Sequence, residues 1–238
     1  MVLKNHYEPT ASLAWAVRKF VPGIEIFGGI DLNRSVGGVN PAAVERMVMM
    51  KGGYGRVIWM PTFDAENQVR YSKENRPFVS VSRDGALLPE TKEVIALAAK
   101  HGLLLETGHS SAAECLMLLR EAKRAGVQRT VVTHAIIAPI HMSIPQMKEA
   151  AGLGAYIEFV YNALIGQNKE FTFADYVGAI RAVGPEHCIL SSDLGQANNP
   201  LHPGGLIAFF AGLKQAGITQ AEIDLMSKTN PARALGLN

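Results

Sequence analysis

The chain has 238 residues, of which 48% are hydrophobic and 18% are charged; this is enough for one large core and too little for two ordinary enzyme domains. The formal net charge of +2, with Lys and Arg scattered along the chain, gives no nucleic-acid footprint. The two cysteines form neither a disulfide framework nor a zinc spacing, and no segment approaches the ~18 apolar residues of a membrane span. We expect one domain, 1–238, in a soluble cytoplasmic protein.

A short β-rich run followed by an amphipathic helix repeats along the chain. Strands are predicted, in chain order, at 2–6, 25–33, 56–62, 103–109, 129–134, 155–161 and 188–194. Helices are predicted at 10–20, 41–51, 90–101, 112–125, 143–151, 173–183, 203–216 and 220–234. Asn40 before Pro41 is typical of a helix start, and Gly102 and Gly126 stand where a helix ends.

This alternation of strands and helices predicts a parallel sheet. No Gly-rich dinucleotide fingerprint follows the first strand, and polar residues end several strands, which favours a (β/α)8 TIM-type barrel over a doubly wound sheet. The first strand begins at residue 2 with no helix before it, so we expect the barrel to lack its first βα unit. Residues 63–88, polar and with Asp84-Gly85 as a turn, are predicted to form an insertion over the active face, either a lid or an oligomer contact.

Three of the predicted strands end in a residue that can bind a metal: His109, His134 and Asp193. The last inward side chain of a barrel strand points to the mouth of the barrel, so these side chains should gather there. Imidazole and carboxylate together suit zinc, manganese or iron, with a coordination position left open for water. A single strand-end His is more often structural, but the three together favour a metal centre.

The order His, His, Asp on the fifth, sixth and eighth strands is the ligand order of the amidohydrolase superfamily. T-G-H, V-T-H and S-S-D-L-G-Q resemble its sites if one βα unit is missing. Nearly the whole chain is similar to an uncharacterised amidohydrolase-like family through L-K-N-H-Y at 3–7, F-G-G-I-D-L-N-R-S-V-G-G-V-N-P-A-A-V at 27–44, W-M-P-T at 59–62 and N-P-A-R-A-L-G-L at 230–237. The resemblance implies a hydrolytic metal site where Asp193 binds metal and takes a proton from the attacking water.

The superfamily's first strand supplies an H-x-H pair, which this sequence lacks. We interpret the difference as truncation, either a start at an internal Met or a fragment, and weak metal binding by the remaining residues is the alternative. Lys4 and His6 lie two residues apart on the equivalent of the second strand and therefore share a face. His6 is the predicted additional metal ligand. Lys4 is predicted to act as an acid or base, because desolvation lowers the pKa of an ammonium, and pairing with a barrel carboxylate is the alternative.

Four further residues are predicted near the substrate: Asn33, Glu158, Gln196 and His202. Asn33 ends a strand, although a turn role competes. Glu158 lies within a strand, where a buried salt bridge is the favoured explanation and orientation of Lys4 or a ligand His is the alternative. Gln196 and His202 lie on the loop after Asp193.

The predicted function is that of a metal-dependent hydrolase, with zinc as the metal and manganese or iron as alternatives, that attacks an amide, lactone or related bond of a small molecule. Two alternatives stay open: a metal-dependent decarboxylase or lyase acting on a small acid, and a non-catalytic barrel that has lost its first-strand ligands. An open barrel exposes strand edges, so we expect a homo-oligomer.

Overall fold

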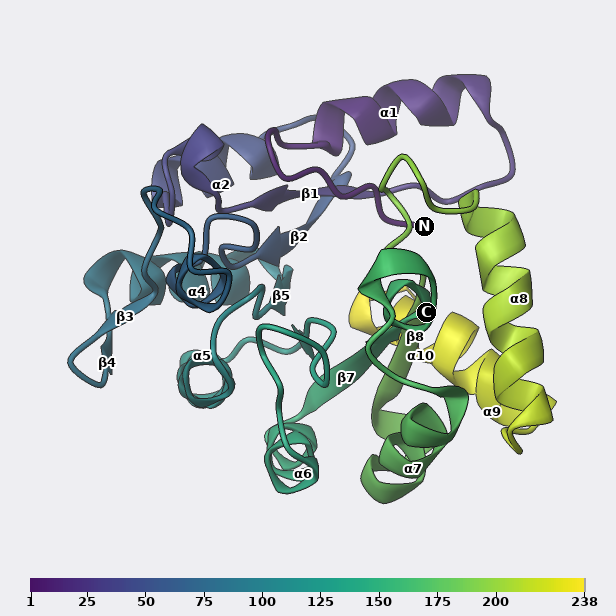
Figure 1. The fold of residues 1–238 in the computed structure, drawn as a ribbon. Coiled ribbons are helices and arrows are strands. Elements are labelled where there is room, and N and C mark those ends of the chain that lie inside the picture. Colours follow the sequence, from purple (N-terminus) through teal and green to yellow (C-terminus); the bar gives the residue numbers. More distant parts are fainter. Residues whose placement is uncertain (238) are drawn as a thin grey trace. The chain divides into compact units, whose positions relative to one another are not determined.

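The computed structural model describes residues 1–237, and the chain divides into two compact units, unit 1 (Met1–Val131) and unit 2 (Val132–Asn238). Within each unit, strands alternate with helices, which confirms the predicted α/β class (Figure 1). The prediction of a single domain stays a prediction. In the residues described, no helix is both long enough and apolar enough to cross a membrane.

Unit 1 contains most of the parallel strands. Its elements are α1 (Ala11–Phe20), β1 (Gly28–Asp31), η1 (Arg34–Val36), α2 (Pro41–Val48), β2 (Gly55–Trp59), α3 (Glu66–Tyr71), β3 (Ser82–Arg83), β4 (Ala86–Leu87), α4 (Pro89–His101), β5 (Leu104–Glu106), α5 (Ala112–Ala125) and β6 (Thr130–Val132), whose last residue belongs to unit 2. Strand β1 pairs with β2, β2 with β5, and β5 with β6, all in parallel. Strands joined through helices therefore lie side by side, as right-handed βαβ units do.

The predicted first strand, 2–6, is wrong in its extent. Only Val2 pairs, in a single parallel bridge to Phe27, supported by a hydrogen bond of 2.8 Å from the Leu3 N–H to the Phe27 carbonyl. The predictions for β5 and β6 run too far at their carboxyl ends, because the backbone turns at Gly108 (φ 60°) and at His134 (φ 26°). Strand geometry requires a negative φ.

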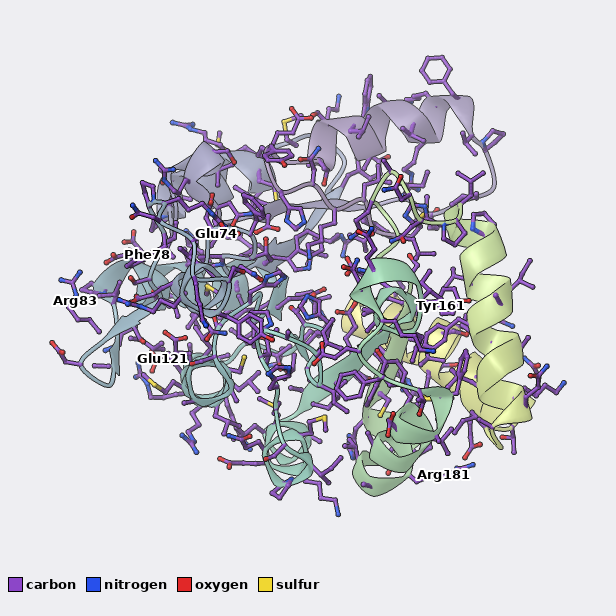
Figure 2. The ribbon with its side chains drawn as sticks, viewed as in Figure 1. Glu74, Phe78, Arg83, Glu121, Tyr161 and Arg181 are labelled. Carbon is purple, nitrogen blue, oxygen red and sulfur yellow. The ribbon has the colours of Figure 1, made fainter. Side chains whose placement is uncertain are left out.

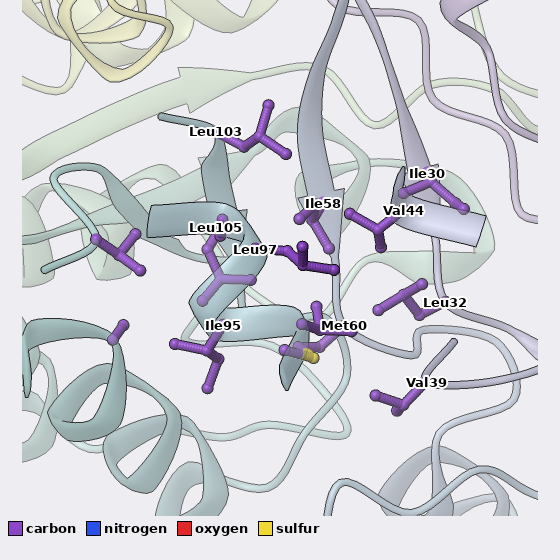
Figure 3. Packing of buried hydrophobic residues seen from close by; sticks show 14 of the residues in the cluster. Ile30, Leu32, Val39, Val44, Ile58, Met60, Ile95, Leu97, Leu103 and Leu105 are labelled. Atoms are coloured by element: carbon purple, nitrogen blue, oxygen red, sulfur yellow. The ribbon is translucent and has the colours of Figure 1, made fainter. Parts of the chain in front are cut away.

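The core of unit 1 lies between its strands and helices α2, α4 and α5. Ile30, Ile58 and Leu105 come from three neighbouring strands and belong to one cluster with Val44 of α2 and Ile95 of α4 (Figure 3). These side chains are at most 2% exposed, and burying one of this size contributes about 1.5–3 kcal/mol. The layer fixes the strands whose carboxyl ends carry the candidate site residues.

The predicted helix caps at Asn40, Gly102 and Gly126 are confirmed. The Asn40 side chain accepts a hydrogen bond from the Ala43 N–H, with Pro41 in the first turn. Gly102 and Gly126 adopt the left-handed conformation after α4 and α5. These caps satisfy helix ends that would otherwise leave backbone groups without partners.

The insertion at 63–88 is more structured than its composition suggests. It contains the short helix α3 and the antiparallel hairpin β3–β4. Asp84 (φ 49°) and Gly85 (φ 76°) form the turn of this hairpin, as predicted. Phe78 and Arg83 project from the same region (Figure 2). Whether the insertion acts as a lid or as an oligomer contact stays a prediction.

Unit 2 continues the alternation. After the end of β6 its elements are α6 (Ile144–Gly152), β7 (Ala155–Val160), η2 (Tyr161–Leu164), η3 (Gly166–Asn168), α7 (Phe173–Val183), η4 (Pro185–His187), β8 (Cys188–Ser191), α8 (His202–Gln215), α9 (Gln220–Asp224), η5 (Leu225–Thr229) and α10 (Asn230–Ala234). Strands β7 and β8 pair in parallel. The last predicted helix, 220–234, is continuous but passes through the π-helical segment η5.

The core of unit 2 contains a cluster of aromatic rings. The Tyr176 ring of α7 lies 5.1 Å from the Phe159 ring of β7 and 6.2 Å from the Phe209 ring of α8. The Tyr161 ring stacks on the Phe209 ring with the ring centres 5.3 Å apart. Ring pairs at these separations add to the stabilisation from burial, and they hold α7 and α8 on β7.

Candidate active site

His6 is held by a buried polar network in unit 1. Its Nδ1 lies 3.1 Å from Asp31 Oδ2 and 2.8 Å from Thr62 Oγ1, and the Thr62 hydroxyl donates to the same Asp31 oxygen at 2.8 Å. Because both neighbouring oxygens accept, Nδ1 carries the proton of a neutral ring and the lone pair lies on Nε2. The His6 side chain is 39% exposed, so this ring can meet a ligand.

Asp31 and Thr62 are residues of this network that the sequence analysis missed. Asp31 ends β1, and its side chain has no exposed surface. Among the described residues its Oδ1 has no hydrogen-bond partner, so the carboxylate depends on the two donors at Oδ2, since a buried charge without donors is costly. The signal for Asp31 was an acidic residue at the end of an otherwise apolar strand.

Asn33 joins the loops that follow β1 and β2. Its side-chain oxygen accepts from the backbone N–H groups of Thr62 at 3.0 Å and Asp64 at 3.1 Å. Its amide nitrogen donates to the His6 carbonyl at 3.1 Å and to Thr62 Oγ1 at 3.0 Å. Asn33 is 1% exposed, so in unit 1 it positions the backbone around His6.

His109 follows β5 after a tight turn. A Cβ at Gly108 would lie 2.2 Å from the Met60 carbonyl oxygen, so only glycine allows this approach. The His109 N–H donates to the Pro61 carbonyl at 2.9 Å. The ring contacts helix α3 of the insertion, with Nδ1 2.8 Å from Gln68 Oε1. The amide oxygen is an acceptor, so His109, like His6, carries its neutral-form proton on Nδ1.

Lys4 lies close to an aromatic ring in unit 1. Its Nζ is 5.6 Å from the centre of the Trp59 ring, within the range of a cation–π contact. Trp59 is the last residue of β2, so Lys4 and His6 both contact the carboxyl-end region of unit 1. An acid or base role for Lys4 stays a prediction.

In unit 2, Glu158 of β7 contacts the segment after β6 and the end of β8. Its Oε2 accepts from the His134 N–H at 3.0 Å, and its Oε1 accepts from the Ser191 hydroxyl at 2.7 Å. His134 is 5% exposed. The carboxylate of Glu158 in β7 therefore fixes the backbone after β6 and the end of β8. Its predicted role in orienting Lys4 or a ligand His stays a prediction.

Asp193 has a left-handed backbone, with φ of 50°. Its Oδ2 accepts from the amide of Asn162 at 3.3 Å. The Asn162 oxygen in turn accepts from Asn199 at 2.9 Å, and Asn199 also donates to Gln196. Gln196 thus belongs to the loop network beside Asp193, whereas His202 is the exposed first residue of α8.

The cysteines are unsuited to nucleophilic catalysis. Both thiols are free and buried. Burial raises the pKa of Cys115 to about 12, and burial likewise raises the pKa of Cys188. Since the thiolate is the nucleophile, both side chains are unreactive at neutral pH.

Each unit contains side chains of the kinds that bind a divalent metal. His6 and His109 are each held through Nδ1 by an acceptor oxygen, the arrangement that orients metal-binding histidines for ligation through Nε2. Asp193 supplies a carboxylate in unit 2. Within residues 1–237, no group of three or more His, Cys, Asp or Glu side chains is close enough to hold a metal ion. The full ligand set therefore stays a prediction.

Comparisons with known proteins bear on family and fold. Residues 1–158 match the family described as "Family of unknown function (DUF6282)". No curated protein matches the chain.

Three solved structures show the fold. An amidohydrolase from Pseudomonas aeruginosa is 15% identical with a TM-score of 0.63, over 99% of this chain and 78% of that one. A zinc-bound amidohydrolase from Burkholderia multivorans is 12% identical with a TM-score of 0.63, over 95% and 78%. A 2,6-dihydroxybenzoate decarboxylase from Rhizobium is 11% identical with a TM-score of 0.55, over 95% and 76%. The predicted α/β fold of the amidohydrolase type is confirmed, with parallel strands that alternate with helices.

Proposed function

We propose that this chain, which belongs to the DUF6282 family, is a metal-dependent enzyme of the amidohydrolase type. Its proposed reaction is the hydrolysis of an amide, lactone or related bond of a small molecule. The observation that carries the proposal is the similar contact that the His6 and His109 rings each make through Nδ1. Each ring is held through Nδ1 at the carboxyl-end side of unit 1, where enzymes of this fold place their reacting groups.

The proposed metal ligands are His6, His109, His134 and Asp193, with zinc as the metal and manganese or iron as alternatives. A bound divalent ion would lower the pKa of a water towards neutrality and polarise the bond to be cleaved. Asp193 is proposed to accept the proton of the attacking water, with Lys4 as a second acid or base. The exposed Gln196 and His202 are proposed to contact the substrate.

The polar residues around the ligands would keep them in place. Asp31 and Thr62 hold the His6 ring, while Asn33 holds the backbone beside it. Glu158 fixes the backbone of His134. Groups fixed before the substrate binds require little reorganisation during the reaction, which favours catalysis.

The first test is metal content, measured by plasma mass spectrometry after reconstitution with zinc. Near-stoichiometric zinc in the wild type, lost in His109→Ala and His134→Ala, is expected. His187→Ala serves as the control, because His187 lies in η4 and is partly exposed. Zinc that is absent from the wild type, or equally retained in all variants, would overturn the metal assignment and leave a non-catalytic barrel as the better explanation.

Decarboxylation of a small acid is the second candidate, favoured by the likeness in fold to the Rhizobium decarboxylase. The two reactions differ in their products. Hydrolysis incorporates oxygen from labelled solvent water into the product, whereas decarboxylation releases carbon dioxide without it. Screening amides, lactones and small aromatic acids in labelled water therefore separates the two candidates.

We also propose a homo-oligomer. Three apolar side chains of unit 1 on or after α1 are substantially exposed: Trp15 at 47%, Phe20 at 83% and Ile24 at 46%. Exposed apolar side chains of this size favour association. Sedimentation velocity on the wild type and on Phe20→Ser should show a weaker oligomer in the variant, and a wild-type monomer would contradict the proposal.

A further inference from the structure

The insertion at 63–88 contacts His109 at both its side chain and its backbone. Gln68 Oε1 lies 2.8 Å from His109 Nδ1, and the Asn67 amide donates to the His109 carbonyl at 3.1 Å. Both residues belong to α3. The region between β2 and β3 thus holds the ring and the peptide of a residue that lies about 40 positions later in the chain.

The orientation of the Gln68 side-chain amide is set by Ser72, the residue that follows α3. Its nitrogen donates to the Ser72 hydroxyl at 2.8 Å, which leaves the oxygen to face the imidazole. An oxygen can only accept, so the proton of the neutral His109 ring lies on Nδ1 and the lone pair on Nε2.

Helix α3 is itself fastened to the rest of the insertion. The Glu66 N–H donates to the Val79 carbonyl at 2.9 Å, and the Val79 N–H donates to the Asp64 carbonyl at 2.7 Å. The Ser80 hydroxyl donates to the Glu66 carboxylate at 2.5 Å. These bonds place Gln68 before any ligand arrives.

We propose that Gln68 is the positioning residue of His109, and that the insertion serves to select the tautomer of this ring that can bind a metal through Nε2. The inference deepens and rests on the proposed function. In the other tautomer Nε2 carries a proton and has no lone pair to offer, so removing Gln68 would cost metal affinity without removing a ligand.

The test compares Gln68→Met, which removes the acceptor and keeps the length of the side chain, with Gln68→Glu, which keeps an acceptor oxygen for His109 and for the Ser72 hydroxyl. Arg70→Met is the matched control, because Arg70 belongs to α3 but pairs with Glu66 rather than with His109. Each variant is examined in the full chain by two measurements.

Nitrogen NMR of the His109 ring, at a pH where imidazoles are neutral, reports the tautomer without any metal. The His109 signals are assigned by their absence in His109→Ala. Wild type, Gln68→Glu and Arg70→Met should show the Nδ1–H form, and Gln68→Met should shift towards the Nε2–H form. An unchanged tautomer in Gln68→Met overturns the inference.

Zinc competition with a chromophoric chelator is the second measurement. Gln68→Met should weaken zinc binding by about tenfold, the lower end of the range for removing an orienting partner, while Gln68→Glu and Arg70→Met should stay near the wild type. Equal affinity in Gln68→Met and Arg70→Met also overturns the inference. A wild type that binds no zinc removes the proposed function, but the NMR result still decides whether Gln68 sets the tautomer.

Discussion

The two units fix their candidate site residues in different ways. In unit 1, His6 and His109 are held by neighbouring side chains: Asp31 and Thr62 for one ring, Gln68 for the other. In unit 2, His134 and Asp193 have left-handed backbones, with φ of 26° and 50°. One carboxylate, Glu158, supports the peptide of His134 and the end of β8.

This difference bears on how each unit responds to mutation. A side-chain network loses stability when any member is removed, because the remaining buried groups lose partners. A strained backbone behaves differently, since a glycine at the same position relieves the strain while removing the functional group. Positive φ in non-glycine residues is often found at functional sites, which is consistent with the roles proposed for His134 and Asp193.

The largest effect is expected at Asp31. Asp31→Ala removes the acceptor of two hydrogen bonds, from His6 and Thr62, and should lower the free energy of unfolding by about 3 kcal/mol, since bonds to charged groups contribute more than neutral ones. Chemical denaturation measures the loss. Thr62→Val, alone and combined with Asp31→Ala, completes a double-mutant cycle. Additive losses would show that the residues do not act as a network.

A smaller loss is expected at Glu158 in unit 2. Glu158→Leu leaves the His134 N–H and the Ser191 hydroxyl without their acceptor and should cost about 2 kcal/mol of unfolding free energy. Glu158→Gln is the control. Its oxygen can accept from His134 while its amide donates to Ser191, so the loss should be well under half as large. Equal losses in both variants would mean that the charge of Glu158, rather than its hydrogen bonds, stabilises unit 2.

Backbone strain at Asp193 predicts a difference in stability between two variants that both lack the carboxylate. Asp193→Gly should be more stable than Asp193→Ala by about 1 kcal/mol, because a left-handed residue with a Cβ costs about that amount. Thermal unfolding of the pair measures the difference. Both variants should lose zinc to a similar degree if Asp193 is a ligand. Equal stability would argue against backbone strain at this position.

The smallest effect is expected at a surface ion pair of unit 2. This pair belongs neither to the side-chain network of unit 1 nor to the strained backbone of unit 2. The hydrogen bond from Arg181 lowers the pKa of Glu222 to about 2 from 4.5. A depressed carboxyl pKa stabilises the folded state above the unfolded value of 4.5, and that contribution is lost as the pH falls towards 2. Arg181→Met should therefore flatten the acid dependence of stability in this range and change nothing at the site. Unchanged acid dependence would contradict the pairing.

The sequence by itself determined the strand and helix alternation, because hydrophobic periodicity reports which face of each element is buried. It also placed His109, His134 and Asp193 close to the carboxyl ends of strands, since a strand with both faces covered is apolar up to the point where it ends. Asp31 had a signal of the same kind. No such signal marked how far strand pairing extends in residues 2–6, because pairing there depends on a partner, Phe27, and not on local composition.

Only the tertiary structure decided how those residues are held. The contact of His109 with Gln68 joins residues 41 positions apart, and α3 lies in the polar insertion at 63–88, where no helix was predicted. Nothing in the local pattern marks Gln68, because hydrogen bonds between distant side chains are chosen when the elements pack and not when they form. The left-handed backbones of His134 and Asp193 were equally invisible in the sequence, since neither residue is a glycine and their φ angles are imposed by the packed strands around them.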